Sequence, residues 1–158
     1  MRYRSVARIL LVLFYTIAGL LHLFLPAPFI AITPGWVPAP QLVIALTGIA
    51  ELAGAAGLIQ WRWPQLRRAA GWGLAAYALC VWPANFQHML IDLSRSDGGG
   101  AGLAYHLPRL AAQPLVIWLA LWAGEAIDWP WRRRLERDAE KWAPDFRDKS
   151  RGNRDTGA

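Results

Sequence analysis

Five ionisable residues interrupt segments of the chain that are otherwise apolar. They are His22, Glu51, His88, Arg109 and Glu125. Ionisable groups inside long apolar segments are rare because they are costly to desolvate, so each one is a candidate functional group. A carboxylate or an imidazole can carry a proton, and a guanidinium can bind an anion. Proton transfer and ligand binding are therefore the chemistries that these residue types offer.

Helix geometry predicts which polar groups meet. At a rise of about 1.5 Å per residue, Glu51 lies near the middle of its apolar segment, and the other groups lie nearer to one common end. We expect one polar pocket, lined by His22, Glu51, Asn85, Arg109 and Gln113. Supporting positions are Thr47, Pro83, Pro114 and His88. Such a network either binds a ligand or only fixes how the helices pack, and the residue types fit both roles.

Arg109 is the predicted partner of Glu51, because it is the only cation expected in that half of the apolar segments. Gln113, four residues after Arg109 on the same helix face, would bridge the two groups if they do not meet directly. Thr47, four residues before Glu51, would add a hydroxyl. Glu125 lies near the opposite end and is expected to reach water.

Two prolines lie inside apolar segments that are expected to be helical. Because proline has no N–H, Pro83 leaves the carbonyl of Leu79 without its helical donor, and Pro114 does the same to Leu110. Such carbonyls need another donor or line a cavity. Both prolines stand close in sequence to predicted pocket residues, which supports a polar layer at this depth.

The apolar segments themselves predict the fold. Four runs approach the roughly 20 helical residues that cross a hydrocarbon core of about 30 Å, at about 6–25, 41–60, 69–90 and 107–127. No segment alternates with a period of two, so a β-barrel is excluded. The first run exceeds the roughly 7–15 apolar residues of a signal peptide and is expected to be a retained helix. The predicted fold is an all-α integral membrane four-helix bundle.

Positive residues predict the orientation of this bundle. Fifteen of the 17 Lys and Arg residues lie before or at the start of the first run, between the second and third runs, or in the last 30 residues, whereas Arg95 and Arg109 fall on the other side. Because positive residues favour the cytoplasmic side, both termini are predicted to be cytoplasmic in a bacterial-type inner membrane. The outer loop 26–40 has five prolines and no charge, and we expect a lid or a short interfacial helix there.

Composition separates a membrane domain from a charged tail. The chain is 55% hydrophobic but has a net charge of +6, and nine of its Lys and Arg residues lie within 129–158. Residues 1–128 are therefore predicted to form the membrane domain. The tail is expected to have one interfacial helix at Trp131–Trp142 and to be largely disordered. No basic stripe crosses the apolar part, so nucleic acid is not an expected partner.

Metal and dithiol chemistry are not predicted for this chain. Cys80 is the only cysteine, which excludes an intrachain disulfide and a dithiol redox pair. His22 and His88 without a cysteine pair make a weak zinc signature, so no metal site is predicted. No cofactor motif is evident, although a quinone or a lipid would suit the expected pocket.

An ordered set of residues resembles a known family. Along the chain this set is Ala18, Gly19, His22, Pro26, Phe29, Pro34, Pro38, Pro40, Gly48, Glu51, Pro83, Ala84, Asn85, Arg109, Leu110 and Gln113. It is similar to the DoxX-like membrane proteins over about residues 5–125. The resemblance implies a compact four-helix membrane bundle and points to the same five pocket residues. The family name comes from a subunit associated with a thiosulfate:quinone oxidoreductase, and related members look like assembly factors.

These observations favour a binding or accessory role over an enzyme. The expected role is that of an accessory or assembly factor, or of a subunit that binds quinone or lipid in the outer half of the bundle. Its partners would be the lipid bilayer and another membrane protein or redox complex. One alternative is a membrane oxidoreductase subunit or isomerase that uses Glu51 as a proton carrier, with His22 nearby. A second alternative is a small transporter.

Overall fold

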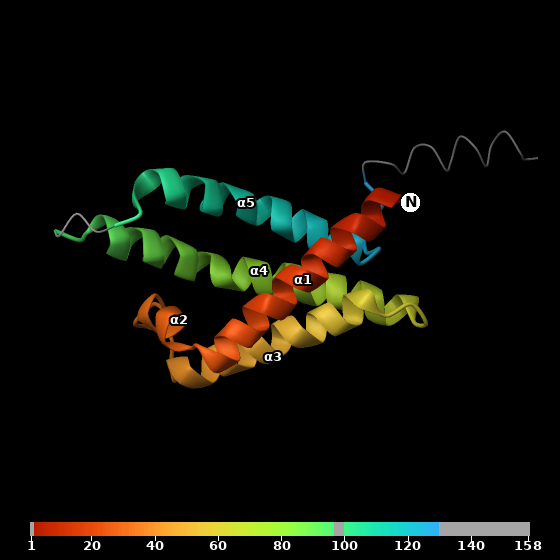
Figure 1. Ribbon diagram of the computed structural model, residues 1–158, viewed down its shortest axis with the longest axis horizontal. Coiled ribbons are helices and arrows are strands. Elements are labelled where there is room, and N and C mark those ends of the chain that lie inside the picture. The colour runs from red at the N-terminus through yellow and green to blue at the C-terminus, as the bar shows by residue number, and fades with distance from the viewer. Residues whose placement is uncertain (1, 97–99, 130–158) are drawn as a thin grey trace, which may run out of the picture. The chain divides into compact units, whose positions relative to one another are not determined.

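The computed structural model describes residues 2–96 and 100–129. These residues contain no β-strand, and their helices (Figure 1) are α1 (Arg2–Phe24), α2 (Ala27–Ala31), α3 (Pro40–Ile59), α4 (Pro64–Leu93) and α5 (Gly102–Ala123). Residues 1–127 form one compact unit, here called the helical unit, and 128–158 form a second. The tail helix predicted at Trp131–Trp142 and the predicted disorder after it lie outside the described residues.

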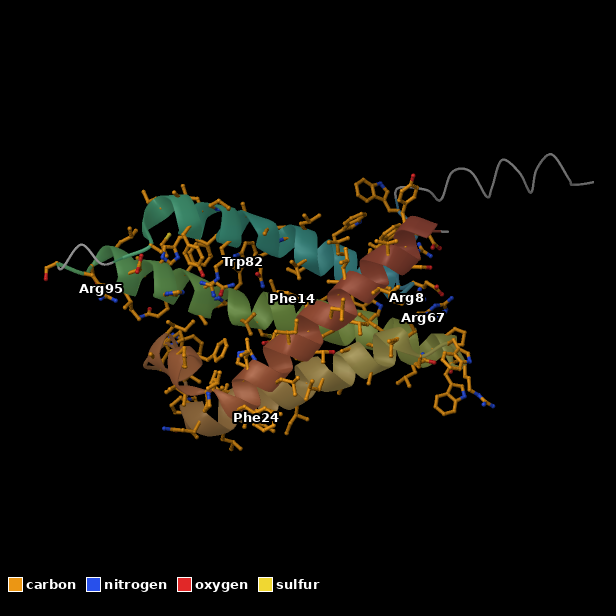
Figure 2. The ribbon with its side chains drawn as sticks, viewed as in Figure 1. Arg8, Phe14, Phe24, Arg67, Trp82 and Arg95 are labelled. Carbon is orange, nitrogen blue, oxygen red and sulfur yellow. The ribbon has the colours of Figure 1, made fainter. Side chains whose placement is uncertain are left out.

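The four long helices of the helical unit alternate in direction and pack in sequence order. α1 packs along α3, α4 packs along α5, and α3 joins the two pairs through α4. α2 contacts the start of α3 and forms the short helix that was predicted in the proline-rich loop. Figure 2 shows Arg8 and Arg67 near one end of the helical unit and Arg95 at the other.

Helix boundaries differ from the predicted ones at the polar ends. α3 and α4 each begin at a proline, Pro40 and Pro64, as expected because the first helical residue needs no N–H donor. α4 continues to Leu93, and α5 begins at Gly102 and ends at Ala123. The prediction placed helix ends where apolar residues stop, but backbone hydrogen bonding also continues through polar residues.

Two helices are long and apolar enough to cross a membrane. They span Tyr3–Phe24 and Pro40–Ile59. Among the described residues, α4 and α5 do not reach the same hydropathy, because Trp, Pro, His and Gln dilute their aliphatic residues. The all-helical prediction is confirmed for the described residues. Two of the four predicted spans coincide with helices that are long and apolar enough to cross a membrane.

α1 shows how the sequence divides into faces. Leu11, Tyr15 and His22 are buried, and they recur at the helical period on one side of α1. The other side exposes large apolar residues, namely Val6, Ile9, Leu10, Leu13, Phe14, Ile17, Leu20, Leu21 and Phe24. A water-soluble helix would normally carry polar residues on its exposed face. The sequence of α1 thus supports burial on one face and an apolar environment on the other.

Glycines allow two close helix crossings. A Cβ atom on Gly48 of α3 would lie 2.9 Å from the carbonyl oxygen of Gly19 in α1. A Cβ atom on Gly71 of α4 would lie 2.9 Å from the carbonyl oxygen of Ala120 and 3.1 Å from Cα of Gly124. Small residues at such crossings let the backbones approach, which is common in apolar surroundings.

Candidate binding cavity

A cavity of about 540 Å³ lies in the half of the helical unit farther from the N-terminus. It is lined by all four long helices and by the segment after α1. The five predicted pocket residues all line it, namely His22, Glu51, Asn85, Arg109 and Gln113. Among the supporting residues, Thr47 and Pro83 are on its wall, whereas His88 and Pro114 are not. Most of the other lining side chains are apolar.

Glu51 pairs with His22 rather than with Arg109. The Glu51 carboxylate lies 2.6 Å from Nδ1 of His22, and Glu51 is only 3% exposed. The predicted Arg109 pairing is therefore wrong. The close crossing of α1 and α3 explains the difference, because a Cβ on Gly48 would lie only 3.0 Å from Cβ of His22. The ring centre of Phe29 lies 4.0 Å from the ring centre of His22, so Phe29 packs against this side of the pair.

Two tyrosines that the sequence reasoning missed lie beside this pair. The hydroxyl of Tyr77 faces Glu51 and Thr47. Tyr15 is 2% exposed, lines the cavity and has a hydroxyl without a hydrogen-bond partner among the described residues. The position of Tyr15, seven residues before His22 on the same face of α1, was the available signal.

Thr47 does not assist Glu51 as predicted. Its hydroxyl donates to the carbonyl of Ile44 at 2.7 Å, within its own helix. A threonine inside a helix often bonds to the preceding turn in this way, which competes with contacts to other side chains.

Gln113 forms a different bridge from the predicted one. It accepts a hydrogen bond from Asn85 at 3.3 Å and donates to the carbonyl of Ala78. This carbonyl precedes Leu79, in the turn of α4 that Pro83 disturbs. Gln113 therefore connects α5 to α4 and does not link Glu51 with Arg109.

Arg109 contacts His88 at the same end of the helical unit. Its NH1 group lies 2.9 Å from Nδ1 of His88, and its guanidinium carbon lies 5.9 Å from the ring centre of Tyr105. Because arginine only donates hydrogen bonds, Nδ1 of His88 must accept. His88 thus has a direct role in holding a cavity residue although it does not line the cavity.

The connection between α4 and α5 is held by an acidic residue that the prediction did not use. Asp92 accepts from the backbone N–H of Gly102 at 3.1 Å and lies 3.0 Å from Nε2 of His106. The Gly102 amide and the His106 side chain hold the pKa of Asp92 below its ordinary value. His106 is fully buried, and the prediction missed it because it placed this residue in a loop.

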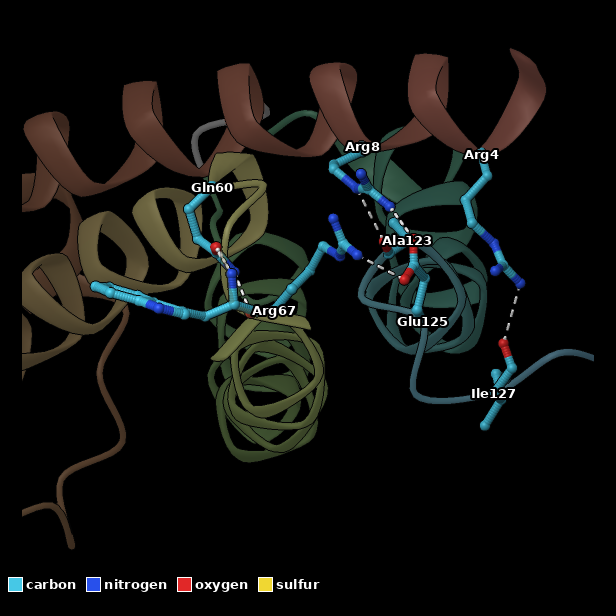
Figure 3. A network of polar contacts seen from close by, with 8 residues as sticks. Arg4, Arg8, Gln60, Arg67, Ala123, Glu125 and Ile127 are labelled. Carbon is cyan, nitrogen blue, oxygen red and sulfur yellow. Dashed lines mark hydrogen bonds and ion pairs between the residues drawn. The ribbon is translucent and has the colours of Figure 1, made fainter. Parts of the chain in front are cut away.

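The opposite end holds three charged residues that we call the clasp, namely Arg8, Arg67 and Glu125 (Figure 3). Arg8 and Arg67 lie 2.8 Å and 2.7 Å from different oxygens of the Glu125 carboxylate. Arg8 also donates to the carbonyl of Ala123 at 3.1 Å. Glu125 was expected to reach water, and its side chain is 28% exposed. It also joins α1, α4 and the end of α5, which was not predicted.

The backbone conformation at Glu125 also indicates a structural role for the clasp. Its φ is 60°, a left-handed conformation that usually selects glycine after a helix. The amides of Glu125 and Ala126 bond to the carbonyls of Trp122 and Leu121, which closes the end of α5. A glutamate in the left-handed conformation is less stable than a glycine would be. Its two ion pairs with arginine offset this cost.

The cavity thus combines apolar walls with a few convergent polar groups. Such a site suits an apolar or amphipathic molecule with a polar head. Within the described residues, no group of three His, Cys, Asp or Glu side chains is placed to hold a metal ion.

A family model described as "Domain of unknown function (DUF8561)" matches residues 11–125. Since this range is more than half of the chain, the chain belongs to that family. The assignment to DoxX-like proteins is therefore wrong. The small residues, prolines and isolated polar residues that suggested it are used widely in close-packed apolar helices and do not identify one family. No curated protein and no solved structure matches the chain.

Proposed function

We propose that this family member is a membrane-embedded binding module whose cavity holds a lipid or a quinone-like molecule. The cavity is the observation that carries the proposal. Its volume of about 540 Å³ falls in the range of about 300–1,000 Å³ that is typical of small-molecule sites. An accessory role beside another membrane protein agrees with a site that binds such a molecule.

Exposed apolar side chains support a position in the bilayer. α3 exposes Leu46 and Ile49, α4 exposes Leu79 and Phe86, and α5 exposes Leu115, as α1 does along its whole length. Contiguous exposed apolar surface of this kind is rare on soluble monomers. We therefore assign four spans of a membrane bundle within α1, α3, α4 and α5, at about 6–25, 41–60, 69–90 and 107–127, so that Asp92 lies outside them.

Positive charge supports the orientation. Arg8 and Arg67 lie near the end that carries the N-terminus, and Arg95 lies at the other end. Under the preference of positive residues for the cytoplasm, both termini face inward in a bacterial-type inner membrane and the cavity lies in the outer half.

The polar groups of the cavity support a ligand with a polar head. A buried hydroxyl without a partner costs free energy, and a ligand acceptor would remove that cost at Tyr15. The Glu51–His22 pair lies on the same wall and adds a second hydrogen-bonding point. A quinone carbonyl or a lipid head group has the matching chemistry.

Native mass spectrometry of the full chain released from detergent micelles tests the proposal. We expect a co-purified amphiphile, or added decylubiquinone or phospholipid, to remain bound to the wild type. Ala84→Phe and Ala112→Phe, which fill the cavity, should lose it, and Ala104→Phe, outside the cavity lining, should keep it. Failure of the wild type to bind any of these molecules would refute the proposal.

The buried Glu51–His22 contact favours proton transfer as a second candidate function. Carboxylate and imidazole at 2.6 Å can exchange a proton with each other or with a ligand. If so, ligand binding should change the carboxylic-acid band in infrared difference spectra, and Glu51→Gln should remove that change. A spectrum with the same band in Glu51→Gln would exclude Glu51 as the carrier.

A further inference from the structure

Arg109 places a permanent positive charge on the cavity wall. A guanidinium is always protonated in proteins, yet its described contacts are with the His88 ring nitrogen and the face of Tyr105. His88 accepts this hydrogen bond, so that its Nδ1 has no proton and the ring is neutral in this contact. Neither partner is an anion.

The nearby acidic side chains are occupied by other partners. Glu51 pairs with His22 at 2.6 Å, and Asp92 lies 3.0 Å from His106. In the part of the chain that the structure describes, no carboxylate lies within ion-pair distance of Arg109. The positive charge of Arg109 therefore has no protein counter-ion there.

Among the described residues, Arg109 is therefore a charged group of the cavity wall without an oppositely charged side chain beside it. The Glu51 carboxylate is hydrogen-bonded to His22 instead. Most of the remaining lining is apolar. A charge in apolar surroundings is costly unless it is paired, so an anion entering the cavity would gain a strong hydrogen bond to Arg109.

We infer that the cavity selects an amphiphile with an anionic head, a carboxylate or a phosphate, which pairs with Arg109 while its hydrocarbon chain contacts the apolar walls. This inference rests on the proposed function and narrows its ligand class. A neutral quinone would satisfy the apolar walls but would leave the charge of Arg109 unpaired.

Matched amphiphiles test the head-group chemistry on the delipidated full-length protein in neutral detergent. One arm compares palmitate with hexadecanol, and the other compares phosphatidate with diacylglycerol, by equilibrium binding. We expect the acid of at least one arm to bind about tenfold more tightly than its neutral match, since hydrogen bonds between ions are stronger than neutral ones. The arm with the larger ratio of acid to neutral affinity shows whether the anionic head group belongs to a free fatty acid or to a phospholipid.

Substitutions test whether Arg109 causes the preference for the acid over its neutral match. Arg109→Gln should reduce the acid-to-neutral ratio to about one, and Arg109→Lys should retain most of it. Arg95→Gln is the matched control, because Arg95 lies after α4 at the same end but not on the cavity lining. If Arg109→Gln does not fold, the wild-type ratios and Arg109→Lys still decide the question.

The outcomes separate the inference from the function on which it rests. Equal binding of acids and neutral matches, lost in Ala84→Phe, would overturn the anionic head group and leave the binding module standing. An acid preference that Arg109→Gln retains would also overturn the inference. Absence of binding by every amphiphile would overturn both proposals.

Discussion

The clasp and the cavity differ in how completely their charged groups are paired. In the clasp, each carboxylate oxygen of Glu125 pairs with an arginine, and the backbone of Glu125 is left-handed. In the cavity, Tyr15 has a hydroxyl without a partner and Arg109 contacts no carboxylate among the described residues. The charges of the clasp are paired within the chain, although Nε of Arg67 has no hydrogen-bond partner among the described residues. In the cavity, the charge of Arg109 is not paired with a carboxylate there, and a bound molecule could pair with it.

This difference separates structural polar groups from functional ones. Fully paired charges fix how helix ends meet and gain little from a ligand. Incompletely paired groups lower stability unless something binds, so those that line a cavity are candidates for ligand contacts. Breaking the clasp is expected to cost the most stability, and removing the hydroxyl of Tyr15 the least.

The largest loss is expected when the clasp is broken. Glu125→Gln leaves Arg8 and Arg67 without a charge partner, and their side chains are only 18% and 12% exposed. Breaking a buried pair costs about 3–5 kcal/mol and an exposed pair at most about 1, so we expect a loss of about 2–3 kcal/mol. Unfolding in detergent, followed by near-UV circular dichroism, measures it.

Glu51→Gln is the matched variant in the cavity. Glutamine keeps a hydrogen bond to His22, so the loss should be about 1 kcal/mol or less, while ligand binding decreases. If Glu51→Gln destabilised the protein as much as Glu125→Gln and left ligand binding intact, the distinction between the two regions would fail.

A loss smaller than that in the clasp is expected where α4 meets the end of α5. In Gly71→Ala, the new methyl group would meet backbone atoms of Ala120 and Gly124, which cannot move as a side chain does. Overpacking of this kind costs about 1–2 kcal/mol. Gly73→Ala is the control, because no heavy atom lies within 4 Å of its Cβ position. Thermal unfolding should show a lower Tm for Gly71→Ala only, and equal Tm values would contradict the close crossing.

The five residues that the sequence places in one pocket all line the cavity. The contacts predicted between them differ from those in the structure. His22, Glu51, Asn85, Arg109 and Gln113 share a wall because isolated polar groups in apolar helices must face inward. Their pairing depends on how closely each two helices approach. A depth estimate along the helix axis does not contain that information.

The α1–α3 crossing illustrates what was missing. Gly19 and Gly48 bring the two backbones together, which puts His22 beside Glu51. Arg109 has the stronger charge, but α5 is not the neighbour that packs along α3. The clasp was missed for a similar reason, since Arg8 and Glu125 are far apart in sequence and meet only after the helices pack.

Acid should weaken the connection between α4 and α5. The pKa of Asp92 is lowered in the folded protein by the Gly102 amide and by His106. Its contacts therefore stabilise the fold fully above the ordinary aspartate pKa of about 3.9, and this stabilisation is lost as the pH falls through the lower folded value. Asp92→Asn should have a lower Tm than the wild type at pH 6, and the difference should close below about pH 4. A pH-independent difference would contradict the assigned role of the carboxylate.

The smallest change in stability is expected at Tyr15, although it is the most buried polar residue that we assign to ligand binding. Its hydroxyl makes no hydrogen bond among the described residues, so Tyr15→Phe removes a buried polar atom without breaking a contact. Stability should stay within about 0.5 kcal/mol of the wild type or increase, because the aromatic ring and its packing against Tyr77 remain. Affinity for the cavity ligand should decrease about tenfold, since an unpaired acceptor on the ligand would then be buried. A loss of stability with unchanged affinity would mean that this hydroxyl belongs, like the clasp, to the structural groups.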